Sequence, residues 1–191
     1  MLTAHGTRRA LLPQEERAFA LNALSKVEGQ QLSTFDFRPA MNTLIIETIK
    51  AALELGEYEL KGQFMLGSNY TFFVEVHYEG VEYKAVYKPS KGEQPLWDFP
   101  DQTLALREVA AFQLSEALGF HIVPFTIYRQ DGPHGPGSLQ QYLDYDVEYH
   151  YFNFTAEDKQ KLRPVVLFDL LANNADRKGS HIFFEDDTQK L

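Results

Sequence analysis

The spacing of apolar residues changes twice along this chain, from helical to alternating and back to helical. From Met41 onward apolar residues recur at helical spacing, and Gly56 is a typical helix end. From residue 58 the period falls to two, which predicts an antiparallel meander of three strands. The predicted strands are Tyr58–Phe64, Tyr70–Tyr78 and Val81–Lys88.

Helical spacing returns in the second half of the chain. Thr103 is a typical helix start and Gly119 a typical helix end, so we expect a helix between them. Thr155 and Asp158 resemble a capping box, which predicts the start of a later helix. Two strands are expected between these helices, at Ile122–Tyr128 and Ser138–Leu143. Strands followed by helices predict an α+β fold with two lobes.

A polar loop, Asn173–His181, lies near the end of the chain. The apolar segment before it, Val165–Leu171, predicts a short buried helix that begins at Pro164. The segment after it, His181–Phe184, predicts a buried strand. Rigid flanks around a loop with a carboxylate, an arginine and a lysine are typical of catalytic loops, although a solvated turn has the same composition.

Composition limits the classes of function. The 191 residues suffice for one ordinary domain or two small lobes. The net charge of -9 argues against nucleic acid as a partner, because such binding needs clustered lysine and arginine. There is no cysteine, no apolar run long enough to span a bilayer and no segment long enough for a signal peptide. We therefore expect a cytoplasmic protein.

Two short features allow two interpretations each, and a third has one. The tip Gly67-Ser68-Asn69 offers backbone amides to an anion such as phosphate, but a hairpin turn needs small residues in any case. Glu108 lies either against other protein groups or in an exposed pair with Arg107. The segment around Trp97, the sole tryptophan, is interpreted as a hydrophobic plug that pins its loop.

Four segments together resemble a bacterial family of phosphatidylinositol-3/4-kinase-like proteins. They are Val86–Pro89, Pro95–Pro100, Arg107–Ala111 and Asn173–Gly179. The family is similar, more distantly, to type II phosphatidylinositol 4-kinases and to HipA-type toxin kinases, and the resemblance covers about residues 50 to 191. It implies a protein-kinase-like fold with an antiparallel-sheet N-lobe at 41–143 and a partial helical C-lobe at 144–191. Residues 1–40 would form an N-terminal extension of unknown role.

The resemblance implies a role for each matching position, with ATP and Mg²⁺ or Mn²⁺ as cofactors. Lys88 would contact the nucleotide phosphates, and Glu108 would pair with that lysine. Asp176 would accept the proton of the attacking hydroxyl. Arg177 would correspond to the arginine that comes directly after this aspartate in the sequence of type II lipid kinases. The phosphates would also be covered by Gly67, Ser68 and Asn69. The adenine base would contact the hinge between the lobes, at Gln140, Gln141 and Tyr142.

Two positions depart from the kinase pattern. His181 stands where the kinase loop has a metal-binding asparagine, and Mg²⁺ prefers oxygen ligands to imidazole. The acidic residue expected on the next strand has no counterpart, because Asp186 and Asp187 come too early. We therefore expect either a truncated product or a chain that another chain completes.

Three functions remain open from the sequence. The first is an ATP-dependent phosphotransferase of the phosphatidylinositol-3/4-kinase-like class that is incomplete in this chain. The second is a non-catalytic nucleotide-binding or interaction module built on a degenerate kinase fold. The third is a HipA-like protein-serine kinase, since an acidic chain without a basic patch is poorly suited to an anionic membrane. The phosphoryl acceptor is therefore a lipid, a protein or a small molecule.

Overall fold

The computed structural model describes residues 38–185, apart from 65–68 and residue 98. The predicted extension 1–40 thus lies almost wholly outside the described residues, as do Gly67 and Ser68 at the hairpin tip. Asn42–Leu191 forms one compact unit, separate from Met1–Met41. The fold below is that of the larger unit.

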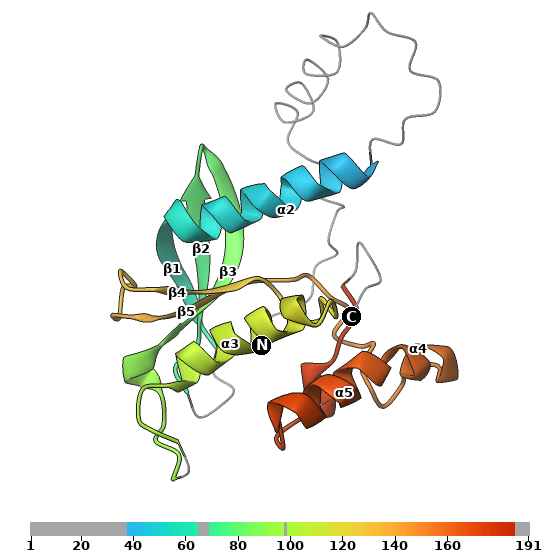
Figure 1. Ribbon diagram of the computed structural model, residues 1–191. Coiled ribbons are helices and arrows are strands. Elements are labelled where there is room, and N and C mark those ends of the chain that lie inside the picture. Colours follow the sequence, from blue (N-terminus) through green and yellow to red (C-terminus); the bar gives the residue numbers. More distant parts are fainter. Residues whose placement is uncertain (1–37, 65–68, 98, 186–191) are drawn as a thin grey trace, which may run out of the picture. The chain divides into compact units, whose positions relative to one another are not determined.

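The centre of the fold is a five-stranded antiparallel sheet in the order β1-β2-β3-β5-β4 (Figure 1). Its strands are β1 (Glu57–Gln63), β2 (Phe72–Tyr78), β3 (Val81–Pro89), β4 (Thr126–Arg129) and β5 (Gly137–Gln141). The helices are α2 (Arg38–Leu55), α3 (Leu104–Ala117), α4 (Ala156–Lys161) and α5 (Arg163–Ala172). These elements confirm the predicted α+β class and the meander of the first three strands.

The two faces of the sheet carry different helices. Leu53 of α2 packs into a fully buried cluster with Tyr87 of β3 and Leu139 of β5. Because successive strand residues point to opposite faces, the neighbouring Lys88 and Ser138 face the other side, where α3 packs against β4 and β5. The sheet therefore has an apolar face under α2 and a face with polar side chains under α3.

Helix α3 begins where the sequence predicts, but its cap is a different residue. The Thr103 hydroxyl donates to the Pro100 carbonyl at 2.7 Å and does not cap the helix. The first amides of α3 are bound instead by the Glu93 carboxylate, which accepts from Leu104 N at 2.9 Å and from Ala105 N at 2.7 Å. A carboxylate at this position satisfies two free amides and favours the helix dipole.

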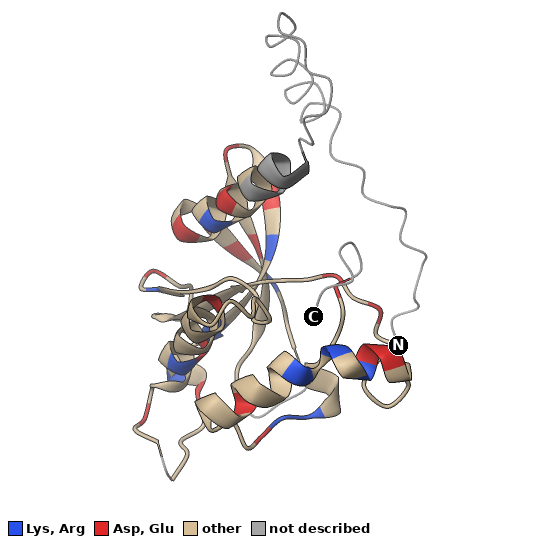
Figure 2. Cartoon of the chain, turned by 45° about the vertical axis from the view of Figure 1, so that its right-hand side comes forward, with Lys and Arg blue, Asp and Glu red and all other residues tan. Residues whose placement is uncertain are grey.

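Helices α4 and α5 follow the sheet in the chain. Thr155 is confirmed as the N-cap of α4, since its Oγ1 accepts from Asp158 N at 3.1 Å. The return hydrogen bond of a capping box is not formed, because Thr155 N donates to the Tyr149 hydroxyl at 3.3 Å. Asn173 ends α5 in the left-handed conformation with φ 52°. Charged residues gather in α4, whereas α5 is mostly uncharged (Figure 2). No helix among the described residues is long and apolar enough to cross a membrane.

Three sequence predictions are wrong. Helix α5 is not buried as a whole, because Val166 and Leu170 are 60% and 75% exposed while Phe168 and Val165 are buried. The predicted strand His181–Phe184 is absent: Gly179–His181 forms a 3-10 turn, and residues 182–185 pair with no strand among the described residues. A strand forms only where a neighbouring strand can bind its backbone N–H and C=O groups. A short apolar run in the sequence does not indicate whether such a neighbour exists.

The third wrong prediction concerns Trp97. Its side chain is 97% exposed and does not pin the loop as a hydrophobic plug. The guanidinium of Arg107 instead lies 3.8 Å from the ring centroid of Phe99, so a different aromatic residue ties this loop to α3.

Candidate functional site

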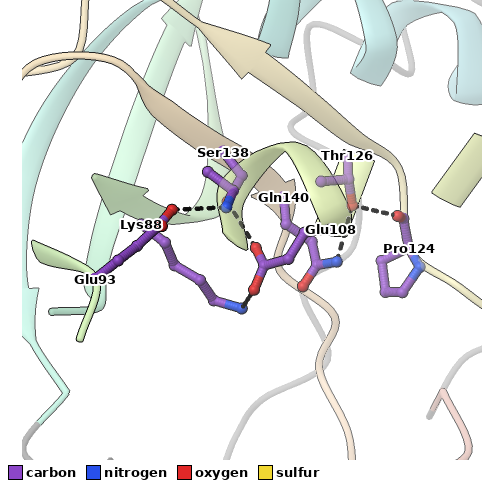
Figure 3. Close-up of polar contacts among 8 residues, drawn as sticks. Lys88, Glu93, Glu108, Pro124, Thr126, Ser138 and Gln140 are labelled. Atoms are coloured by element: carbon purple, nitrogen blue, oxygen red, sulfur yellow. Dashed lines mark hydrogen bonds and ion pairs between the residues drawn. The ribbon is translucent and has the colours of Figure 1, made fainter. Parts of the chain in front are cut away.

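An ion pair joins the end of β3 to α3 at the centre of the candidate site. Lys88 Nζ donates to Glu108 Oε1 at 2.5 Å, and each side chain is 31% exposed (Figure 3). Glu108 therefore contacts other protein groups and is not in an exposed pair with Arg107. The structure brings together these two predicted site residues, which are 20 positions apart in the sequence.

A serine that the sequence analysis missed completes this group. Ser138 lies opposite Lys88 in the β3–β5 ladder, is fully buried, and donates from Oγ to Glu108 Oε2 at 2.6 Å. The preceding residue, Gly137, has no room for a side chain, because a Cβ there would collide with the Lys88 carbonyl. Glycine thus permits the close approach of β5 to β3 that places Ser138 beside the ion pair.

Of the predicted phosphate-binding tip, Asn69 is the residue that the structure describes. Its Oδ1 accepts from Gln94 N at 2.7 Å, and the neighbouring Tyr70 N donates to the Gly92 carbonyl at 3.2 Å. Asn69 therefore fastens the hairpin to the segment after β3.

Most hydrogen-bonding groups of the predicted hinge residues already bind other groups of the protein. Gln141 N donates to the Phe125 carbonyl at 2.9 Å, and Tyr142 N donates to the Lys84 carbonyl at 3.1 Å. The Gln140 side chain donates to Thr126 Oγ1 at 2.8 Å. These groups have partners before any ligand binds, whereas the backbone amide of the next residue, residue 143, has none among the described residues.

The polar loop after α5 is held by a second residue that the sequence analysis missed, Asp169. Arg177 donates to it from Nε at 2.9 Å and from Nη2 at 2.7 Å, and Asn174 Nδ2 donates at 2.8 Å. Burial raises the pKa of Asp169, but these hydrogen bonds outweigh it and hold the pKa below its usual value. The sequence signal was a lone carboxylate inside an otherwise apolar helix.

The two ends of the loop differ in their surroundings. Asp176 pairs with Lys178, whose Nζ lies 3.4 Å from Asp176 Oδ2, but its side chain is 82% exposed, so a ligand can reach the carboxylate. Burial lowers the pKa of His181, and the positive charges of Lys178, Arg177 and Lys88 lower it further. Together these effects outweigh the negative charge of Asp176, which raises the pKa, and favour the uncharged form of the His181 ring.

A metal site at His181 has no visible ligand set. Among the described residues, one group of three ligand atoms lies within 4.8 Å of one another, and it consists of Glu75, His77 and Glu82 on the sheet. Neither His181 nor Asp176 belongs to it. The described residues of the loop therefore hold no preformed group of three metal ligands.

A cavity of about 290 Å³ lies beside the loop. Its walls come from the segment between β5 and α4, including Tyr145 and Phe152, and from the segment after α5 that includes Gly179 and Phe183. Tyr145 stacks on Phe183 with ring centroids 4.1 Å apart. The volume is close to the lower limit for small-molecule sites.

The fold and the site define an α+β protein in which Lys88, Glu108 and Ser138 form a hydrogen-bonded group between the sheet and α3. Protein Rv2133c of Mycobacterium tuberculosis strain H37Rv is 36% identical over 174 residues, which cover 73% of this chain and 62% of Rv2133c. The chain thus spans less than two thirds of that relative's length. No family model and no solved structure matches the chain.

Proposed function

We propose that this chain is an ATP-dependent phosphotransferase of the phosphatidylinositol-3/4-kinase-like class, with a protein-kinase-like fold and a cytoplasmic location. The Lys88–Glu108 ion pair is the observation that carries the proposal. A lysine is a mobile point charge, and a fixed carboxylate holds it where an anionic phosphate can meet it. The partly exposed amine of Lys88 retains hydrogen-bonding capacity for that phosphate.

In this proposal the protein acts mainly by positioning and charge. ATP supplies the phosphoryl group, and Lys88 neutralises charge on its phosphates. Asp176 accepts the proton of the acceptor hydroxyl, which its exposed carboxylate is free to do. Arg177 is turned towards Asp169 and holds the shape of the loop. We derive no step through Mg²⁺ or Mn²⁺, because the described residues show no matching ligand set.

The runner-up is a nucleotide-binding or interaction module without catalysis. It is favoured by the mismatch between His181 and a magnesium site, while the Lys88–Glu108 pair is expected in both proposals. A HipA-like protein-serine kinase differs from the first proposal in its acceptor alone. The net charge of -9 supports a protein or small-molecule acceptor over an anionic lipid surface.

Calorimetric titration of ATP, with and without Mg²⁺ or Mn²⁺, tests the proposal. We expect micromolar binding to the native chain and at least tenfold weaker binding to Lys88→Met. Lys84→Met is the matched control, because Lys84 lies on the same strand and pairs with the exposed Asp144. Absence of ATP binding in a chain that melts cooperatively would contradict both nucleotide proposals and leave an interaction module.

Transfer itself separates the first two proposals. The native chain with radiolabelled ATP and protein, lipid and small-molecule acceptors is expected to label an acceptor, and Asp176→Asn is expected to bind ATP normally but lose the labelling. Binding without transfer to any acceptor would favour the non-catalytic module.

A further inference from the structure

The Glu108 carboxylate has two partners, one on each oxygen. Lys88 binds Oε1 at 2.5 Å, and Ser138 binds Oε2 at 2.6 Å (Figure 3). Both donors come from directly paired positions of β3 and β5, on the face of the sheet that α3 covers. Glu108 is thus held from two adjacent strands, and its orientation does not depend on Lys88 alone.

The three side chains differ in their exposure to solvent, and therefore in whether a ligand can contact them. Lys88 and Glu108 are each 31% exposed, whereas Ser138 has no exposed surface. A ligand can therefore reach the lysine but not the serine. A hydrogen bond from a buried hydroxyl to a carboxylate is charge-assisted and lies where water does not compete for it.

We infer that Ser138 is a positioning residue, which fixes the Glu108 carboxylate so that its other oxygen holds the Lys88 amine in place before a ligand binds. This inference rests on the proposed function for its effect on ATP, but its effect on Lys88 is independent of any nucleotide. Removing the hydroxyl leaves one carboxylate oxygen without its buried donor, and Glu108 then has other rotamers available.

The first arm of the test uses the protein without nucleotide. An amine that is hydrogen-bonded to a carboxylate is less accessible to an amine-reactive ester, so its labelling rate reports how firmly the carboxylate holds it. We expect Ser138→Ala to raise the labelling rate of Lys88, measured by peptide mass spectrometry, about threefold or more, while Lys84 is unchanged. The rate in Ser138→Ala combined with Glu108→Gln should not exceed that in Glu108→Gln alone.

The matched control is Ser115→Ala. Ser115 is also fully buried, but its hydroxyl accepts from Ile122 N at 2.9 Å and does not contact the ion pair. This variant should lose thermal stability and leave Lys88 labelling at the native rate. Equal labelling of Lys88 in the native chain and in Ser138→Ala would overturn the inference, as would an equal rise in Ser115→Ala.

The second arm measures ATP affinity by calorimetry. We expect Ser138→Ala to weaken binding about tenfold in the native background and less than about twofold in Glu108→Gln, because the serine acts through the glutamate. The same loss in both backgrounds would overturn the positioning role. If the native chain does not bind ATP but Ser138→Ala still releases Lys88, the proposed function fails and the positioning role stands.

Discussion

Asp169 and Arg177 form a two-point ion pair between α5 and the polar loop, with distances of 2.9 Å from Nε and 2.7 Å from Nη2. The Asp169 side chain is 15% exposed, and eight residues separate the partners. The parallel hydrogen bonds fix direction as well as distance. The segment that carries Asp176 is therefore anchored through its arginine to the helix before it.

Replacing Asp169 by Asn should loosen this loop. The change removes the charge and one of the two arginine acceptors, at a cost of about 1–3 kcal/mol in unfolding free energy. Amide hydrogen exchange at residues 173–178 should accelerate, whereas Asp144→Asn, which breaks the exposed pair with Lys84, should leave it unchanged. Native exchange rates in Asp169→Asn would show that Arg177 is held by something else.

The interactions of the Asp158 carboxylate in the first turn of α4 should weaken in acid. Hydrogen bonds from Lys161, Tyr149 and Thr155 hold the pKa of Asp158 at about 2, against about 3.9 in the unfolded chain. A lowered pKa contributes stability above the unfolded value and loses it as the pH falls through the folded value. The melting temperature of the native chain should exceed that of Asp158→Asn at pH 7, and the difference should shrink between about pH 4 and pH 2. A difference that is constant down to pH 2 would disprove the assignment.

Trp97 should be dispensable for folding. Because 97% of its surface is exposed, Trp97→Ser should change the free energy of unfolding by less than about 0.5 kcal/mol. The chain has one tryptophan, so the native fluorescence spectrum reports this side chain alone. Emission should match that of free tryptophan in water, and a blue-shifted spectrum would restore the interpretation as a plug.

Local patterns in the sequence predicted most elements, because strand and helix periods are properties of neighbouring residues. The Lys88–Glu108 pair came from resemblance, since periodicity does not show which distant residues meet. Ser138 and Asp169 were missed for the same reason. Ser138 binds Glu108, 30 positions away in the sequence, and Asp169 binds Arg177, which lies beyond the end of α5. The strand predicted at His181–Phe184 is wrong because a short apolar run indicates burial but not whether another strand lies beside it.

The Glu93 carboxylate should be a stabilising cap of α3. It binds the amides of Leu104 and Ala105, which lie 11 and 12 residues further along the chain. Glu93→Ala should lower the unfolding free energy by about 1 kcal/mol, measured by urea denaturation. Glu116→Ala, at the other end of α3, removes the exposed pair with His121 and should cost less. Equal costs would mean that the amides find another partner.

Arg129 should be among the most sensitive positions for stability. Its Nη1 donates to the Leu53 carbonyl at 2.8 Å and the Gly56 carbonyl at 3.0 Å, at the end of α2, while Nε and Nη2 bind Asp131. Arg129 is 9% exposed, so water would not replace the hydrogen bonds that it donates to the two carbonyls. The Asp131 side chain is 63% exposed and can be hydrated when its partner is lost. A lysine has one nitrogen and cannot reach the helix end and the carboxylate together.

We therefore expect Arg129→Lys to destabilise the chain by about 2–4 kcal/mol in urea denaturation, mainly through the carbonyls at the end of α2 that it leaves unpaired. Arg163→Lys is the matched control, because Arg163 is exposed and donates one hydrogen bond, to Gln160. It should cost less than about 0.5 kcal/mol. Adding Asp131→Asn to Arg129→Lys should cost less than it does in the native chain, since the partners form one network. Additive losses would show that Arg129 acts mainly through the end of α2 and that Asp131 contributes separately.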